Sequence, residues 1–270
     1  YVGTVLQIPK HICKKITRLL FKFFWGKKVE CVNRNTMQLP LNEGGFKIVN
    51  ILNKIRAFHV KHICNMFQTE AKWYYFAVYW LGMSLRNFNP DFASNLIPHS
   101  ENIPQFYLQA LVQFKAIIQT DTNFSDITTK KLYVMLMERN TVIPRIIGKY
   151  PRVDFIHVWK NIQNKFVDPT YRDVSWRIAH HVLPVGGYLY EKNISTITVC
   201  YFCKGFESLI HLMVFCNQVL PFWRFIESVI TQYVKTPVKI NAYMILFHIF
   251  PNKLDKVIEN VMNYVWANIV

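Results

Sequence analysis

Apolar residues recur every three or four positions along most of this 270-residue chain, and stretches that alternate with period two are few. Positions three and four apart share one face of an α-helix, so this pattern predicts amphipathic helices rather than a sheet. The predicted helices span residues 11–25, 48–66, 105–119, 128–137, 169–183, 219–234 and 253–269. The expected fold class is therefore mainly α.

The segments between these helices contain residues that end or start helices. Gly26 is placed to end the first helix, Leu39 to Phe46 has the composition of a turn, and three prolines between residues 87 and 104 indicate a linker. Asp168-Pro169 is typical of a helix start, because a capping acid precedes proline at the first helical position. Residues 73–80 are apolar on every side, so they are expected to be buried if helical.

The first helix has an apolar side and a basic side. The apolar side is predicted to hold Ile12, Ile16, Leu19, Leu20 and Phe23, and the basic side Lys14, Lys15, Arg18 and Lys22. Its aromatic residues, from Phe21 to Trp25, are expected mainly in the core, since exposed stacking groups are rarer than buried ones. Stacking on nucleic-acid bases is the alternative.

The net charge indicates a polyanionic partner. The chain carries 32 Lys and Arg against 16 Asp and Glu, a formal charge of +16, and its first 72 residues hold 13 of the cations but only three of the acids. Lys and Arg neutralise nucleic-acid phosphates without reading sequence. The residues predicted to contact phosphates are Lys10, Lys14, Lys15, Arg18, Lys22, Lys27 and Lys28. An ordinary solvated helix face is the alternative.

Composition also excludes two classes of protein. Hydrophobic residues make up 51% of the chain, which excludes a disordered tail. The longest uncharged apolar run, residues 74–83, is well short of the roughly 20 residues that a membrane-spanning helix needs, so no membrane partner is expected.

Four candidate metal ligands cluster near the C-terminal end, at Cys200, Cys203, His211 and Cys216, with the spacing C-x2-C-x7-H-x4-C. Three Cys and one His form a closed tetrahedral set for Zn²⁺, so we expect one structural zinc ion in a small irregular knuckle and no open position for catalysis. Gly205 is expected to supply the backbone twist of this knuckle. Three buried thiols and a core histidine are the alternative.

No catalytic residues are expected. No two acidic residues are adjacent, and the chain contains neither a GxxxxGK phosphate loop nor a GxSxG nucleophile elbow. His180, His181 and His248 lie on apolar helices without a nearby acid or nucleophile in sequence, so they are expected to be structural. Cys13, Cys31 and Cys64 are expected to be inert thiols.

Several short motifs follow one another in a distinctive order. They are Phe24-Trp25-Gly26-Lys27, Leu39-Pro40, Gly44-Gly45-Phe46, Trp159, Trp176-Arg177-Ile178, Leu183-Pro184, Cys200-x2-Cys203, Glu207-Ser208, His211, Cys216 and Trp223. This series resembles the C-terminal part of LINE-type, non-LTR retrotransposon reverse transcriptases. Its last part is similar to the zinc-binding domain of that family.

The resemblance implies a division into four parts. They are a basic thumb-like or connector segment (1–72), a helical linker region (73–165), a zinc-binding domain (166–235) and a C-terminal helical segment (236–270). It also implies template RNA, target DNA and the upstream palm and fingers of the same polyprotein as partners, in a cytoplasmic ribonucleoprotein and in the nucleus. The aromatic-Ala-Asp-Asp motif of the family's polymerase is absent and is expected upstream of Tyr1, so a non-catalytic fragment is expected.

A different class of function stays open. The chain is alternatively a protein–protein scaffold, or a decayed retroelement remnant, that packs on the polymerase palm without binding nucleic acid itself. An autonomous zinc enzyme is disfavoured, because the four-ligand set has no open site.

Overall fold

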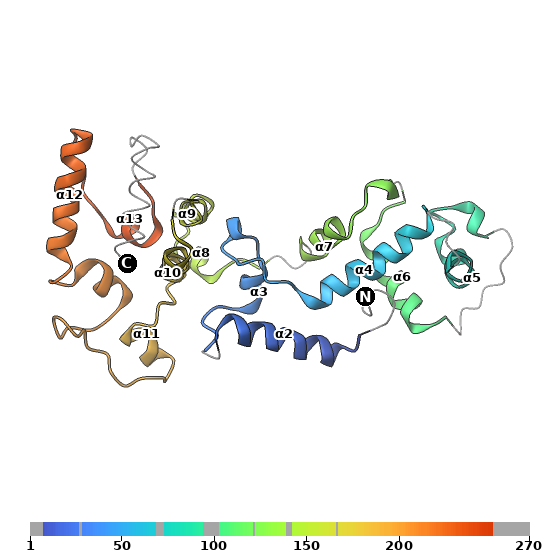
Figure 1. Ribbon diagram of the computed structural model, residues 1–270, viewed down its shortest axis with the longest axis horizontal. Helices are drawn as coiled ribbons and strands as arrows, with labels where there is room; N and C mark the ends of the chain where they lie inside the picture. Colours follow the sequence, from blue (N-terminus) through green and yellow to red (C-terminus); the bar gives the residue numbers. More distant parts are fainter. Residues whose placement is uncertain are drawn as a thin grey trace. The chain divides into compact units, whose positions relative to one another are not determined.

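The computed structural model describes residues 8–26, 29–68, 73–93, 103–120, 122–138, 142–165 and 167–250 (Figure 1). Over these residues the chain is mainly helical and has no β-strand, which confirms the fold class predicted from the spacing of apolar residues. The helix predicted over 253–269 and the cations Lys27 and Lys28 lie outside the described residues.

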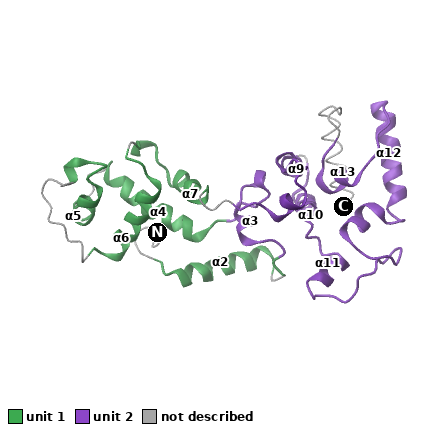
Figure 2. Ribbon diagram, turned by 180° about the vertical axis from the view of Figure 1, so that it is seen from behind, with its two compact units in different colours: residues 1–30, 49–141 green, residues 31–48, 142–270 purple. Residues whose placement is uncertain are grey.

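The chain folds into two compact units (Figure 2). Unit 1 comprises residues 1–30 and 49–141, and unit 2 comprises residues 31–48 and 142–270. The predicted 1–72 segment therefore contributes to both units, because residues 31–48 pack with the C-terminal half. The finer division at residues 72, 165 and 235 stays a prediction.

Unit 1 is built around one central helix. Its helices are α2 (Lys10–Phe24), α4 (Ile51–Met66), α5 (Trp73–Leu85), α6 (Gln105–Ile117) and α7 (Thr129–Glu138), with 3₁₀ turns at Pro90–Ala93 and Phe124–Asp126. Helix α4 contacts the other four, and each of its residues is buried or half-buried. Leu81 of α5, Phe114 of α6 and Leu132 of α7 are completely buried in the core that surrounds it.

Side-chain caps set the ends of these helices close to the predicted positions. The side chain of Asn50 accepts a hydrogen bond from the Asn53 amide at 3.0 Å, so α4 begins at Ile51 and not at residue 48. Thr128 Oγ1 accepts from the Lys131 amide at 3.2 Å at the start of α7, as the sequence predicts.

Two expectations about burial are wrong. Tyr75 and Phe76 of α5 are each 69% exposed, although residues 73–80 were expected to be buried. On α2, Phe23 is 88% exposed and Leu19 is 64% exposed, although both were placed on the buried side. In both helices apolar residues extend around a wide part of the helix surface. The neighbouring helices of unit 1 cover only one side of it, so the remaining apolar residues are exposed.

Unit 2 consists of shorter helices. They are α3 (Arg34–Gln38), α8 (Arg145–Lys149), α9 (Phe155–Ile162), α10 (Pro169–Ala179), α11 (Gly186–Glu191), α12 (Leu220–Val234) and α13 (Ala242–Phe247), with a 3₁₀ turn at Leu41–Glu43 and a π-helical turn at His211–Phe215. The Asp168 side chain accepts from the Thr170 amide at 2.8 Å, which confirms the predicted start of α10. That helix ends at Ala179, before the predicted stop at Pro184.

The predicted turn from Leu39 to Phe46 forms the centre of an aromatic cluster in unit 2. Gly44 has a φ of +84°, and its carbonyl accepts hydrogen bonds from Trp176 Nε1 and His180 Nε2, each at 2.9 Å. Trp159 stacks on His180 with ring centroids 4.7 Å apart. The motif residues Gly44, Trp159 and Trp176 therefore meet in one core although 132 positions separate the first from the last.

None of the helices described by the structure is both long enough and apolar enough to cross a bilayer.

Candidate metal centre and basic surface

The structure brings the four predicted metal ligands together. The ligand atoms of Cys200, Cys203, His211 and Cys216 all lie within 4.8 Å of one another. Cys200 and Cys216 are completely buried, and Cys203 and His211 are half-buried. This proximity is what one shared metal ion requires, so the four side chains could hold a metal.

A tight loop positions the first two cysteines. Val199 and Phe206 form an isolated antiparallel bridge, and the Cys200 amide donates to the Gly205 carbonyl at 2.7 Å. The left-handed residue of this loop is Lys204, with a φ of +61°, and not Gly205 as expected. A Cβ on Gly205 would lie 3.5 Å from Cys203 Sγ and 3.6 Å from the His211 ring, which are ordinary contact distances, so the available space does not require glycine here.

A π-helical turn positions the other two ligands. The Ser208 hydroxyl accepts from the His211 amide at 3.0 Å, and the Cys216 amide donates to the His211 carbonyl at 2.7 Å. Trp223 Nε1 donates to the Met213 carbonyl within the turn at 2.7 Å. The wider π turn thus places residues five apart on the same side, as two ligands of one ion require.

The sulfur–sulfur distance fits a tetrahedral zinc site, whereas the sulfur–nitrogen distance is shorter than the roughly 3.5 Å of such a site and corresponds to a hydrogen bond. Cys200 Sγ and Cys216 Sγ are 3.9 Å apart, and Cys203 Sγ is 3.1 Å from His211 Nε2. With Zn–S bonds near 2.3 Å, two tetrahedral sulfurs are about 3.8 Å apart. The sulfur separation excludes a disulfide between Cys200 and Cys216, and both are free thiols.

Local hydrogen bonds favour a thiolate at one position. The backbone N–H groups of Cys203 and Phe202, with the His211 side chain, lower the pKa of Cys200 to about 6. At Cys216 the Gln218 N–H lowers the pKa, but burial and the neighbouring sulfurs of Cys203 and Cys200 outweigh it and leave the pKa raised. A second thiolate beside the first is therefore opposed unless a cation lies between them.

Glu207 lies between the cluster and α11, and its carboxylate binds a backbone amide of α11. Its carboxylate accepts from the Gly186 amide at 2.6 Å, and its carbonyl accepts from the Gly187 amide at 2.8 Å. A Cβ on Gly187 would lie 2.7 Å from that carbonyl, so only glycine allows this approach. The four donors thus form a closed set that could hold one metal ion.

Helix α2 presents the predicted cations to solvent. Its sequence contains no acidic residue, and Lys10, Lys14, Lys15, Arg18 and Lys22 are all exposed. Among the residues that the structure describes, these five cations form no salt bridge. Leu19 and Phe23 lie on the same exposed face, whereas Phe21 and Trp25 are buried. The aromatic residues of this segment therefore divide between core and surface.

A group of exposed aromatic residues surrounds the metal cluster and was not predicted. Tyr201 is 79% exposed, Phe202 and Phe206 are more than half exposed, and Lys204 Nζ lies 5.1 Å from the centroid of the Tyr201 ring. The signal in the sequence is the pair of aromatic residues between Cys200 and Cys203, which a buried loop would also contain. The exposed fractions of these rings show that they form an exposed loop and not a buried one.

The remaining candidates have structural roles. His180 donates to Gly44, and the backbone carbonyl of the buried His248 accepts from Asn161 Nδ2 at 2.8 Å. Burial raises the pKa of the Cys64 thiol to about 12, which disfavours the reactive thiolate.

Comparison with known proteins supports a retrotransposon origin. The chain is 26% identical over 124 residues, 42% of its length, to the "Transposon TX1 uncharacterized 149 kDa protein" of Xenopus laevis. It spans about 9% of the length of that relative. This similarity confirms the resemblance to a protein derived from a non-LTR retrotransposon. No protein-family model matches the chain.

Proposed function

We propose that this chain is a non-catalytic, nucleic-acid-binding segment of a retrotransposon reverse transcriptase, stabilised by one structural zinc ion. In this proposal α2 lies along the phosphate backbone of template RNA and primer DNA. The observation that carries the proposal is the exposed face of α2, which displays four cations from Lys14 to Lys22 and no acid.

The arrangement of charge supports contact with phosphates. Cations without carboxylate partners repel one another along a helix, and a polyanion relieves that repulsion while releasing its own counterions. Phe23 adds an exposed ring beside Lys22 on the same helix. Single-stranded nucleic acid combines phosphates with accessible base faces, so it matches both kinds of side chain.

Zinc is the metal that the donor set favours. Thiolate and imidazole are ligands for zinc, and a closed set of three Cys and one His is typical of structural sites. Cys200, Cys203, His211 and Cys216 would hold the ion, and zinc would supply cohesion between the knuckle and the π turn. The exposed rings of Tyr201 and Phe202 would then stack on unpaired bases from a rigid loop.

Catalysis is assigned to other parts of the parent protein in this proposal. The sequence has no adjacent acidic pair, and the four-ligand set has no open position. The segment would act in the cytoplasmic ribonucleoprotein and in the nucleus, beside the palm and fingers of the same polyprotein.

The experiment is an RNA-binding titration with a matched pair of charge reversals. The chain should bind single-stranded RNA with an affinity that falls steeply as salt rises. Lys14→Glu/Lys15→Glu should weaken binding at least about tenfold, because two phosphate contacts become repulsive. Lys130→Glu/Lys131→Glu on α7 changes the charge equally at another exposed pair, and its effect should be smaller.

Two results would overturn this function. One is RNA binding that salt does not weaken, or no binding at all. The other is an equal loss in the two double variants, which would show that net charge and not the α2 surface attracts RNA.

The exposed face of α5 favours a second candidate, a scaffold that packs on the polymerase palm. Tyr75, Phe76 and Tyr79 are exposed on one helix of unit 1, and such apolar patches are typical of protein interfaces. This function predicts that the chain aggregates alone and becomes soluble when co-expressed with an upstream palm. It also predicts no RNA binding, which separates it from the first candidate.

A further inference from the structure

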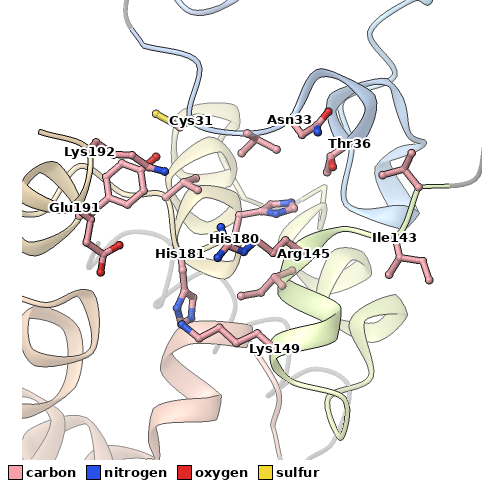
Figure 3. Close-up of a pocket in the computed structure, with 15 residues that line it drawn as sticks. Cys31, Asn33, Thr36, Ile143, Arg145, Lys149, His180, His181, Glu191 and Lys192 are labelled. Carbon is pink, nitrogen blue, oxygen red and sulfur yellow. The ribbon is translucent and has the colours of Figure 1, made fainter. Parts of the chain in front are cut away.

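Unit 2 contains a cavity that the metal cluster does not use. Its volume is about 530 Å³, within the usual range for small-molecule sites. It is lined by residues of the 31–36 segment, by α8 and the residues just before it, by residues 180–182 directly after α10, and by α11 with Lys192. Figure 3 shows Arg145 and Lys149 extending from α8 toward His180 and His181.

The charges that line this cavity are mostly positive. Arg145, Lys149 and Lys192 contribute three cations, and Glu191 contributes the lining carboxylate. Within the described residues, neither the Arg145 nor the Lys149 side chain forms a salt bridge or a hydrogen bond, and Lys149 Nζ lies 5.7 Å from the centroid of the Tyr150 ring. These two residues are four apart on one short helix, so their like charges face the same space.

Uncharged hydrogen-bond donors line the same space. His181 has a left-handed backbone with a φ of +57°, and its Nε2 is buried without a hydrogen-bond partner in the described part of the chain. Burial and the nearby Lys149 lower the pKa of His181 to about 4, so the ring is neutral at pH 7. Asn33 and Tyr188 add side chains that can donate.

We propose that this cavity binds a phosphate group of a nucleotide, with Arg145 and Lys149 as its charged contacts and His181 as a neutral donor. Arg matches phosphate oxygens with two parallel N–H groups, and Lys adds a point charge. A cation is a poor occupant, because three positive side chains face the space and one carboxylate opposes them. The volume exceeds that of phosphate alone and leaves room for a sugar or base.

This site goes beyond the proposed function and does not depend on it. Helix α2 belongs to unit 1, whereas each residue that lines the cavity belongs to unit 2. The phosphate can come from a free nucleotide or from a nucleic-acid strand, and the chemistry of recognition is the same for both.

The test is a calorimetric titration of the zinc-loaded chain with AMP, with inorganic phosphate and with a single-stranded oligoribonucleotide. Arg145→Gln/Lys149→Gln should lower the affinity for the phosphate probes at least about tenfold, because two charge-assisted hydrogen bonds are lost. Arg152→Gln/Lys160→Gln removes two exposed cations from the same unit outside the cavity, and should change affinity by less than about twofold.

The outcomes distinguish a free nucleotide from a nucleic-acid strand as the source of the phosphate. They also distinguish binding in the cavity from binding on α2. Binding of AMP identifies a free nucleotide as sufficient, and binding of the oligoribonucleotide alone identifies a strand. Lys14→Glu/Lys15→Glu should keep AMP binding intact, so failure of the α2 function leaves this result unchanged. Equal losses in the two glutamine double variants, with melting temperatures unchanged, or no binding of any probe to the parent chain, would overturn the proposal.

Discussion

Gly44 shows how a single residue positions the core of unit 2. Its left-handed backbone points the carbonyl at Trp176 and His180, and its lack of a side chain admits Trp159. A Cβ at this position would lie 2.7 Å from the Trp159 indole, closer than packed atoms approach.

We therefore expect Gly44→Ala to destabilise unit 2 by about 2–4 kcal/mol, through backbone strain and overpacking together. Gly148→Ala is the matched control, because its Cβ would meet nothing within 4 Å and it lies in helix α8. That change should be neutral or stabilising by up to about 1 kcal/mol. Urea denaturation of the zinc-loaded chain measures both; equal effects would contradict the role of Gly44.

His180 and His181 make the stability of unit 2 depend on pH. Burial lowers the pKa of His180 from 6.5 to about 4, and burial with the nearby Lys149 does the same for His181. Between pH 6.5 and 4 the unfolded chain binds protons at these imidazoles while the folded chain does not. Their contribution is therefore fully present above pH 6.5 and is lost as the pH falls toward 4.

We expect stability to fall over this interval by up to about 3 kcal/mol for His180, and by less for the more exposed His181, where solvent screens the interaction. Acid also displaces zinc from thiolates, so the test compares the pH dependence of a histidine variant with that of the parent chain. Urea denaturation at several pH values should show a shallower dependence for His180→Gln/His181→Gln than for the parent chain. Parallel curves would show that these histidines do not cause the acid sensitivity.

At the scale of an element, the π-helical turn at His211–Phe215 positions two of the four ligands. The Ser208 hydroxyl holds the His211 amide, and Trp223 holds the Met213 carbonyl. Groups that orient metal ligands commonly change metal affinity by 10- to 100-fold when they are removed.

Ser208→Ala should accordingly lower zinc affinity about tenfold, because the start of the turn loses its cap. Ser228→Ala is the control, since that hydroxyl donates to Phe225 within α12 and touches no ligand. Competition with a chromophoric chelator measures both affinities. An unchanged affinity in Ser208→Ala would remove this hydroxyl from the site.

The exposed ring of Phe23 on α2 is expected to stack on a base of bound RNA. Phe23→Ala should leave stability unchanged and weaken single-stranded RNA binding by about 1–3 kcal/mol, the usual value of one stacked base. Phe225→Ala removes a similarly exposed ring from α12 and should not affect binding. Fluorescence anisotropy with labelled RNA measures the difference, and equal binding by the two variants would show that Phe23 does not stack.

At the scale of the whole molecule, the candidate metal site belongs to one unit. All four ligands lie in unit 2, where Val214 of the π turn packs with Trp223, Ile230 and Met244. The buried core of unit 1 contains none of them. Structural zinc contributes directly to folding, so its removal should affect the two units differently.

Chelation should accelerate amide hydrogen exchange in α11, α12 and α13 while leaving exchange in α4 and α6 unchanged. Mass spectrometry of exchange measures both units in one sample. Cys203→Ser, with lower zinc content, should already show the fast exchange and respond little to chelator, whereas Cys64→Ala should keep the chelator-dependent exchange of α11, α12 and α13. Uniform acceleration across both units would contradict this separation.

The features that could be predicted from the sequence depend on residues close together in the chain. The periodicity of apolar residues predicted α2, α4, α6, α7 and α12, because helix formation depends on neighbours three and four positions away. Short helices such as α8 and α13 have too few turns to show that period, so the sequence does not reveal them. The ligand set was evident because thiolate and imidazole chemistry depends on residue type and close spacing.

Residue type and spacing along the chain are enough to predict the mainly helical fold, the basic character of α2 and the four clustered candidate ligands. Contacts between helices determine which faces are covered: Phe23, Tyr75 and Tyr201 are exposed, whereas Phe21 and Trp25 are buried. The tertiary structure alone brings Gly44 to Trp176 and forms the cavity beside Arg145 and His181. The physical reason is that burial and cavities depend on contacts between residues far apart in the chain, which local periodicity does not encode.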